Sequence, residues 1–123
     1  MEFSPKIAEA ILQADSKALA TSGKHGINVV PVSTVRVVGG KILLMNYFLY
    51  KTLENLLEEP KVAFACWKGL EGYQIKGTIE YVTRGTQFEE AKKWIEDNVV
   101  DRTLLGLLIL TPEEVHNVSP GAN

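Results

Sequence analysis

A stretch that ends in a predicted helix carries side chains suited to binding an anion. It runs from Asn46 to Asn55 and reads NYFLYKTLEN. The first amides of a helix lack partners and carry a partial positive charge, which favours a phosphate group. Lys51 adds a full charge, Thr52 adds a hydroxyl donor, and Asn55 can cap or brace the loop. The same pattern also fits an ordinary capped helix with a solvated lysine, because short motifs of this kind are common.

A valine-rich segment, residues 28–38, has the composition of a strand but contains a proline. Pro31 cannot donate a hydrogen bond to a neighbouring strand, so it normally marks an edge or an interruption. One explanation is that its open side faces a flat heterocyclic ligand, to which nearby backbone amides could donate. The residues involved would be Pro31, Val32, Ser33 and Thr34. The other explanation is that Pro31 only protects an edge strand against aggregation.

Aromatic side chains near these two segments could stack on such a ligand or exclude water from it. They are Tyr47, Phe48, Tyr50, Trp67 and Tyr73. Aromatic residues belong more often to a core or an interface, and the sequence leaves both interpretations open.

The sequence assigns no catalytic residue and no metal ligand. Cys66 is the single cysteine and alternates with Val62 and Phe64, which is typical of a small buried side chain. His25 and His116 have no metal-ligand spacing. The chain also lacks a Ser-His-Asp order, a P-loop and a dinucleotide fingerprint. We therefore expect no metal site.

Composition limits the class of protein. The 123 residues are 46% hydrophobic and 23% charged, which is typical of one globular domain, here residues 1–123. A net charge of −2 argues against nucleic-acid binding. The longest apolar run, residues 104–110, is far shorter than the roughly 20 residues of a membrane span. The first residues show no secretory pattern, so we expect a cytoplasmic protein that binds neither membrane nor nucleic acid.

Three helices and about six strands are expected to position these residues. The helices are predicted at about 5–14, capped by Ser4, at 51–59, and at 86–98, where Thr86 and Glu89 have the form of a capping box. The strands are predicted at 17–21, 28–38, 41–46, 62–67, 73–83 and 103–110, the last of them stopped by Thr111-Pro112.

Two glycine signals refine this arrangement. Gly39 and Gly40 can both adopt a positive φ, which predicts a tight antiparallel hairpin between the second and third strands. Gly77 lies inside a predicted strand and marks a bulge or a close approach of two backbones. Short antiparallel strands joined by tight turns predict a mainly β domain, either a barrel or a strongly curled sheet.

A barrel of this size has room only for its own side chains, so a ligand must bind outside it. In so small a domain, a second subunit would best supply the other wall of the binding site. A symmetric dimer is therefore expected.

In this order the motifs resemble the FMN-binding split-barrel family related to pyridoxamine 5′-phosphate oxidase, and most closely its small dimeric members. The similarity extends over nearly the whole chain. It is densest from Asn28 to Leu56, where the glycine hairpin and Lys51-Thr52-x-x-Asn55 stand in the family's spacing. The segment GYQIKG, residues 72–77, also matches. The resemblance implies a six-stranded antiparallel split barrel with Greek-key-type topology and about three flanking helices.

The resemblance also implies how FMN would bind. Lys51 and Thr52 would hold its phosphate, and Pro31 to Thr34 would lie against the isoalloxazine ring, with Asn46 and Tyr47 beside it. It further implies a homodimer. The second chain would cover the flavin through Trp67, Tyr73 or Gln74 and through the tail around His116.

The expected function is that of an FMN flavoprotein, an oxidoreductase or electron carrier that exchanges electrons with a small-molecule donor or acceptor. Pyridoxamine oxidation is not expected, because family members with that activity are longer and end in an Arg-containing motif, whereas this chain ends in VHNVSPGAN. One alternative is a non-catalytic module that binds flavin or haem, with His116 as a haem ligand. Another is a dimer that has lost its ligand. A deazaflavin with a similar phosphate tail fits the same residues as FMN.

Overall fold

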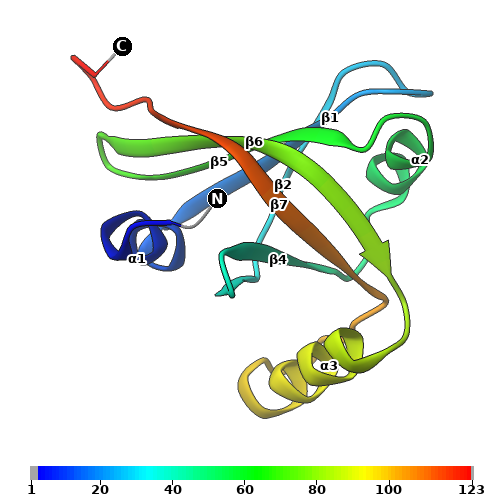
Figure 1. The fold of residues 1–123 in the computed structure, drawn as a ribbon. Helices are drawn as coiled ribbons and strands as arrows, with labels where there is room; N and C mark the ends of the chain where they lie inside the picture. Colours follow the sequence, from blue (N-terminus) through cyan, green and yellow to red (C-terminus); the bar gives the residue numbers. More distant parts are fainter. Residues whose placement is uncertain (1–2, 123) are drawn as a thin grey trace.

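Three helices surround one curled sheet of seven antiparallel strands in the computed structural model, which describes residues 3–122 (Figure 1). The helices are α1 (Pro5–Gln13), α2 (Tyr50–Glu58) and α3 (Thr86–Asn98). The strands are β1 (Ser16–Thr21), β2 (Asn28–Pro31), β3 (Val35–Val38), β4 (Lys41–Asn46), β5 (Lys61–Lys68), β6 (Glu71–Val82) and β7 (Gly106–Asn117). No helix in this described part of the chain is long and apolar enough to span a membrane.

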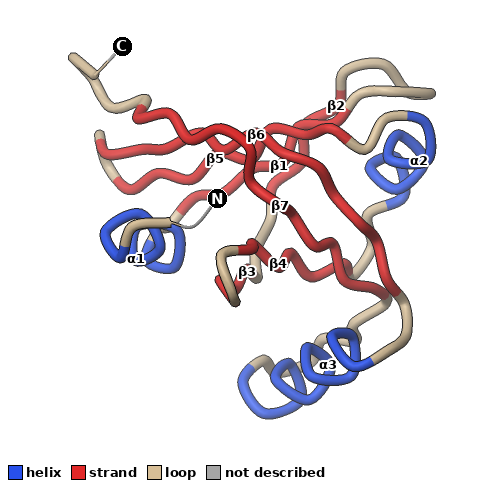
Figure 2. The backbone as a smooth tube through the Cα atoms, viewed as in Figure 1, coloured by secondary structure: helices blue, strands red, loops and turns tan. Residues whose placement is uncertain are grey.

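The sheet is split between two strands that are consecutive in the chain. Its order is β2-β1-β5-β6-β7-β4-β3, so β2 and β3 form its two ends although only residues 32–34 separate them (Figure 2). That segment bridges the ends. The amide of Val32 donates to the carbonyl of Lys17 over 3.0 Å, and the carbonyl of Thr34 accepts from the amide of Met45 over 3.2 Å. The mainly β split barrel is confirmed.

The predicted strand at 28–38 is wrong in one respect, because it is two strands. This raises the count from the expected six to seven. Pro31 ends β2 since it has no amide hydrogen for a ladder, and the chain then crosses to the opposite end of the sheet. Within residues 3–122, the amides of Ser33 and Thr34 donate to no other group. Two free backbone donors therefore lie at the split.

The local turn and cap signals near the N-terminus are confirmed. The hydroxyl oxygen of Ser4 accepts from the amide of Ile7 over 3.2 Å and so caps α1. Gly39 and Gly40 have φ values of +58° and +76°, which two-residue hairpins require, and they join β3 to β4. Both signals depend on residues close together in sequence.

Two predictions about the C-terminal half are wrong. Gly85, not Thr86, is the N-cap of α3, and no side chain in the described part of the chain caps this helix. The carbonyl of Gly85 accepts from the amide of Glu89. β7 runs through Thr111-Pro112 instead of stopping there. The ladder between β6 and β7 shifts register next to Gly77, which pairs with Pro112. Proline lacks an amide hydrogen, and it is tolerated here because it stands at this irregularity in the ladder. A Cβ on Gly77 would collide with the carbonyl of Thr111, which confirms the expected close approach.

Buried side chains form two clusters on opposite faces of the sheet. β4 belongs to both, because its successive side chains alternate between the faces. α1 inserts Ile11 into the first cluster, which fills the curl. α3 covers the opposite face at β4 and β7 with Phe88, Ala91 and Ile95.

The rest of that outer face carries small side chains. Ala18 and Ala20 of β1 pair in register with Ala65 and Ala63 of β5, and all of them are only partly buried. Their neighbours Leu19 and Phe64 point the other way, into the first cluster. We call Ala18, Ala20, Ala63 and Ala65 the outer alanine face. It is flat because its side chains are short.

Candidate functional site

The start of α2 has the unpaired donors that the sequence predicted. Its N-cap, Leu49, has no side-chain hydrogen bond, and the turn before it is shaped by the carbonyl oxygen of the Asn46 side chain, which accepts from the Leu49 amide over 2.7 Å. Thr52 is 1% exposed, and its hydroxyl has no hydrogen-bond partner among the described residues. Lys51 is exposed beside it and makes no ion pair within the same range.

A second orphaned group lies on the strand next to this helix. The side-chain nitrogen of Asn28, at the start of β2, is also buried without a partner. β2 packs against α2, so both unsatisfied groups belong to the same pair of elements. Leaving a buried polar group unpaired costs about 1–3 kcal/mol. The sequence analysis did not single out Asn28, because nothing in its local pattern indicates that its side-chain nitrogen is buried.

Asn55 braces the loop between β1 and β2. It is fully buried, and its side-chain nitrogen donates to the Thr21 hydroxyl over 3.1 Å and to the Gly26 carbonyl over 3.0 Å. Its side-chain oxygen accepts from the His25 amide over 2.8 Å. Both amide hydrogens are therefore used within the protein. Of the roles that the sequence suggested for Asn55, the structure provides the bracing one.

A hollow of about 600 Å³ lies along the split in the sheet. Its apolar wall is formed by residues 29–32 with Phe48 and Trp67, and Ser33 stands at its end. Lys17 and Arg102 also line it. The volume lies within the range of small-molecule sites, which are mostly apolar with a few polar groups. We call this space the split hollow.

Hydrogen bonds hold the residues behind the split hollow. The Tyr47 hydroxyl donates to the hydroxyl oxygen of Thr34 over 2.8 Å. The side-chain nitrogen of Asn46, a residue that is 2% exposed, donates to the Tyr81 hydroxyl over 2.9 Å. Thr34 and Tyr47 are thus joined, and Asn46 is next to Tyr47 in the chain, but all three side chains are engaged with the protein. Their function in the structure is to fix the ends of β3 and β4 around the hollow.

The remaining predicted residues separate into different surroundings. Trp67 lines the split hollow, whereas Tyr73 is 5% exposed and belongs to the core cluster inside the curl. Gln74 is half-buried on β6 and pairs in register with His116 of β7. A ring nitrogen of His116 lies 3.1 Å from a carboxylate oxygen of Glu114. Gln74 and His116 lie on the outer face and do not line the split hollow.

Cys66 and Glu54, whose pKa values are shifted, do not line the split hollow. Burial raises the pKa of the Cys66 thiol, so this cysteine is less reactive than a free one. The hydrogen bond from Lys24, together with that to His25, lowers the pKa of Glu54. No group of histidine, cysteine and acidic side chains within residues 3–122 could hold a metal ion.

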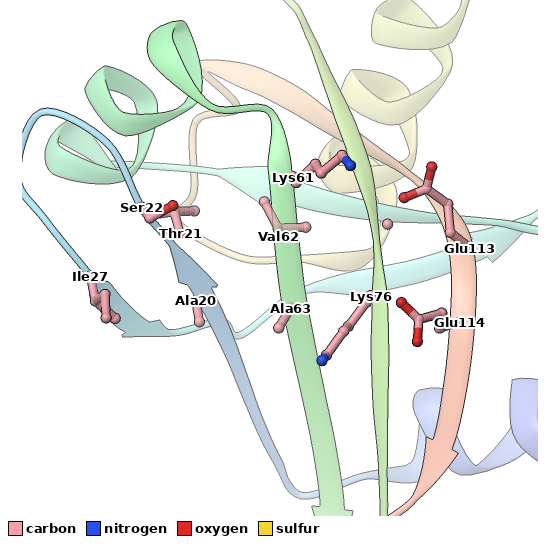
Figure 3. Close-up of a pocket in the computed structure, with 11 residues that line it drawn as sticks. Ala20, Thr21, Ser22, Ile27, Lys61, Val62, Ala63, Lys76, Glu113 and Glu114 are labelled. Carbon is pink, nitrogen blue, oxygen red and sulfur yellow. The ribbon is translucent and has the colours of Figure 1, made fainter.

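Another hollow lies on the outer face, next to the outer alanine face. It measures about 330 Å³ and is lined by Ala20, Ala63, Lys61, Lys76, Glu113 and Glu114 (Figure 3). Among the residues that the structure describes, none of these lysines and glutamates is joined in a salt bridge across this hollow. Charges of both signs therefore stand beside a flat apolar surface, and Glu114 contacts His116 rather than either lysine.

Comparison with known proteins agrees with the fold. The sequence model of the family described as pyridoxamine 5′-phosphate oxidase matches residues 3–119. The chain belongs to this family. One relative within reach of sequence comparison is an uncharacterised protein of Methanocaldococcus jannaschii. It is 33% identical over 109 residues, which cover 84% of this chain and 72% of the relative.

Solved structures extend the pyridoxamine 5′-phosphate oxidase fold to more distant proteins. HupZ of Group A Streptococcus superposes with a TM-score of 0.86 at 24% identity, covering 98% of both chains. An FMN-binding protein of Syntrophomonas wolfei superposes with a TM-score of 0.79 at 20% identity, and the match covers 93% of this chain and 87% of that protein. HutZ, the haem storage protein of Vibrio cholerae, superposes with a TM-score of 0.72 at 15% identity, and the match covers 95% of both chains. At these identities the likeness shows the shared fold.

Proposed function

We propose that this protein is a flavoprotein that binds FMN non-covalently, with the phosphate at the start of α2 and the ring in the split hollow. The observation that carries the proposal is the orphaned hydroxyl of Thr52 at a helix start without a side-chain cap. Family membership and an FMN-binding structural relative support it.

The proposed site for the FMN phosphate is supported by hydrogen-bond donors that lack acceptors. The first-turn amides of α2, the Thr52 hydroxyl and the Asn28 side chain all require an acceptor that the described residues do not supply. Lys51 adds the charge of a surface ammonium group.

The proposed site for the FMN ring is supported by the shape and chemistry of the split hollow. Valine, proline and aromatic side chains provide an apolar wall for a flat ring, and the free amides of Ser33 and Thr34 can donate to carbonyl oxygens at its edge. The bonds Tyr47–Thr34 and Asn46–Tyr81 hold this edge rigid. Residues that bind a cofactor need such support from their neighbours.

A homodimer completes the proposal. The outer alanine face continues into the split hollow, because Ala18 and Val29 line the hollow while Ala20 and Ile27 line the neighbouring charged one. A second copy seated on this face would close the hollow and pair its lysines with the partner's glutamates. Small flat residues and charges of both signs suit a two-fold interface, where the same patch meets itself.

FMN would supply the electron chemistry, and the protein would orient it and exclude water. Neither a catalytic acid nor a base stands out among the described groups, so we infer an oxidoreductase or electron carrier that works with a small-molecule donor or acceptor. Pyridoxamine oxidation is not part of the proposal. A deazaflavin with a phosphate tail would use the same contacts.

A non-catalytic haem- or flavin-binding module is the second candidate. The observation that favours it is His116, which lies on the outer face and whose side chain is 46% exposed. An imidazole in such a place can ligate haem iron. The likeness to a haem storage protein supports the same candidate.

The experiment is to purify the protein, record its absorption spectrum, and identify the molecule released on denaturation by its mass. We expect a flavin spectrum, the mass of FMN, and far weaker binding of riboflavin, which lacks the phosphate. Bleaching by NADH or NADPH would support an enzyme, and bleaching only by dithionite a carrier. A Soret band would favour the haem module. A colourless protein that does not take up FMN would contradict both candidates.

A further inference from the structure

Arg102 presents an unpaired cation to the split hollow. It lies in the loop between α3 and β7, lines the hollow, and is itself exposed. Within residues 3–122 it forms no ion pair with a carboxylate. An arginine is always charged at physiological pH and offers a planar fork of donors that fits phosphate and carboxylate oxygens. Its place at the rim makes it available to a ligand that comes and goes.

The structure holds this guanidinium in position. Its central carbon lies 5.4 Å from the centre of the Tyr47 ring, in cation–π geometry. The Tyr47 hydroxyl is tied to Thr34 over 2.8 Å, so the ring that supports Arg102 is itself fixed. After Arg102, the amide of Leu105 donates to the carbonyl of Asn46 over 2.9 Å and anchors the loop to β4.

The residue before Arg102 has an unusual backbone conformation. Asp101 has a φ of +60° and is the single non-glycine residue in the described chain with a positive φ. This conformation is uncommon, and aspartate is among the residues that tolerate it best. It turns the chain sharply after α3 and delivers Arg102 to the hollow. Such backbone outliers often occur at ligand-binding positions.

A second cation faces the same space. The ammonium group of Lys17 donates to the carbonyl of Ala14 over 2.9 Å, which holds this half-buried side chain beside the hollow. One carboxylate, Asp15, also lines the hollow. The charged side chains at this site therefore comprise Lys17 and Arg102 against Asp15, with a net charge of +1.

We propose that the split hollow contains an anion subsite, in which Arg102 binds a phosphate or carboxylate group of the second, diffusible substrate. The inference rests on the proposed function, because it assumes that the hollow takes a cofactor ring and that a partner molecule docks over it. Arg102 would select anionic electron donors or acceptors over neutral ones of the same shape. Lys17 contributes to the local potential.

The test measures binding of unreactive anions to the FMN-loaded protein by isothermal titration calorimetry. The probes are ADP and inorganic pyrophosphate for phosphate, succinate for carboxylate, and adenosine as the neutral counterpart of ADP. The variants are Arg102→Gln and Arg102→Lys. Arg36→Gln is the matched control, because Arg36 also stacks on an aromatic ring, 4.9 Å from the centre of Trp94, but does not line the hollow.

We expect ADP or succinate to bind better than adenosine, and Arg102→Gln to weaken that binding by about tenfold to a hundredfold. Arg102→Lys should restore it only partly, since an ammonium group lacks the planar fork. Arg36→Gln should bind the anion like the natural protein. The preferred probe identifies which anionic group the subsite accepts.

Several results would overturn the subsite. One is equal affinity of the natural protein and Arg102→Gln for the anion, and another is the absence of any anion binding. A third is loss of FMN itself in Arg102→Gln, which would make Arg102 a cofactor ligand. A separate FMN titration of the natural protein distinguishes these results from failure of the proposed function. If FMN binds and anions do not, the subsite alone is wrong. If FMN does not bind and Arg102-dependent anion binding remains in the protein without FMN, the proposed function is wrong, and an anion site at Arg102 stands without its role toward a second substrate.

Discussion

The side-chain nitrogen of Asn55 donates to the hydroxyl oxygen of Thr21 over 3.1 Å, a fully buried contact between residues 34 positions apart. It joins α2 to the end of β1, and the same side chain also holds the loop that leads to β2. The helix start proposed to bind phosphate is thus fixed to the strand that forms the split hollow. A cofactor that spans both would meet two elements whose relative position is already set.

Removing the charge of Lys51 should weaken FMN binding. Lys51→Ala loses one charge-assisted contact of roughly 1.5–3 kcal/mol, so the dissociation constant should rise about tenfold to a hundredfold in a flavin fluorescence titration. Lys92→Ala, on the exposed side of α3, serves as the control and should bind FMN normally. Unchanged affinity in Lys51→Ala would remove this residue from the site.

Thr52→Val should have effects of opposite sign on stability and on binding. Valine fills the same volume without the orphaned hydroxyl, so the free energy of unfolding without FMN should rise by about 1 kcal/mol. FMN affinity should fall roughly tenfold, because a phosphate contact is lost. Urea denaturation and flavin titration measure the two quantities. Thr86→Val, at the exposed first turn of α3, is the control, and a less stable Thr52→Val chain would contradict the argument.

Asn55→Ala should destabilise the protein strongly. It removes bonds to Thr21, Gly26 and His25 and leaves buried groups without partners, so we expect a loss of about 2–4 kcal/mol in urea unfolding. Asn98→Ala is the matched control, since Asn98 is exposed and its side chain, among residues 3–122, bonds only to the Trp94 carbonyl. That change should stay within about 0.5 kcal/mol. Similar losses in the two variants would refute the bracing role.

Stability should depend on pH through Glu54. Lys24 and then His25 lower the pKa of its carboxyl from 4.5, so the folded chain holds the proton less tightly than the unfolded chain. The contribution is present above pH 4.5 and is lost as the pH falls through the lowered, folded-state pKa. In Glu54→Gln, the urea concentration at half unfolding should therefore change less with pH in this acidic window. Glu58→Gln, on the same helix, should keep the slope of the natural protein.

A large charged side chain on the outer alanine face should separate the proposed dimer. Ala63→Arg places a bulky cation in the middle of a flat surface, so light scattering should report a monomer. FMN affinity should fall as well, because the split hollow loses its second wall. Thr83→Arg, in the exposed loop after β6, is the control. A dimeric Ala63→Arg protein would place the interface elsewhere.

Local signals in the sequence were sufficient to predict several helices and turns. The cap at Ser4, the hairpin at Gly39-Gly40 and the helix that carries Lys51, Thr52 and Asn55 all follow from residues within one or two turns of each other. The path of β7 through Pro112 was not predictable in this way. Its tolerance of proline comes from Gly77, a partner more than thirty residues earlier in the chain.

The same distinction applies to the site. The sequence by itself determined the type of most elements and the cluster of donors at the start of α2, and it marked Pro31 as an edge or an interruption, because each is a property of the local backbone. Tertiary structure decided that the chain breaks there and that the two ends of the sheet meet at this break, and it buried the side-chain nitrogen of Asn28. It also brought Arg102 to Tyr47 across more than fifty residues. Those relationships arise from the curl of the sheet, which depends on long-range strand pairing that no short segment encodes.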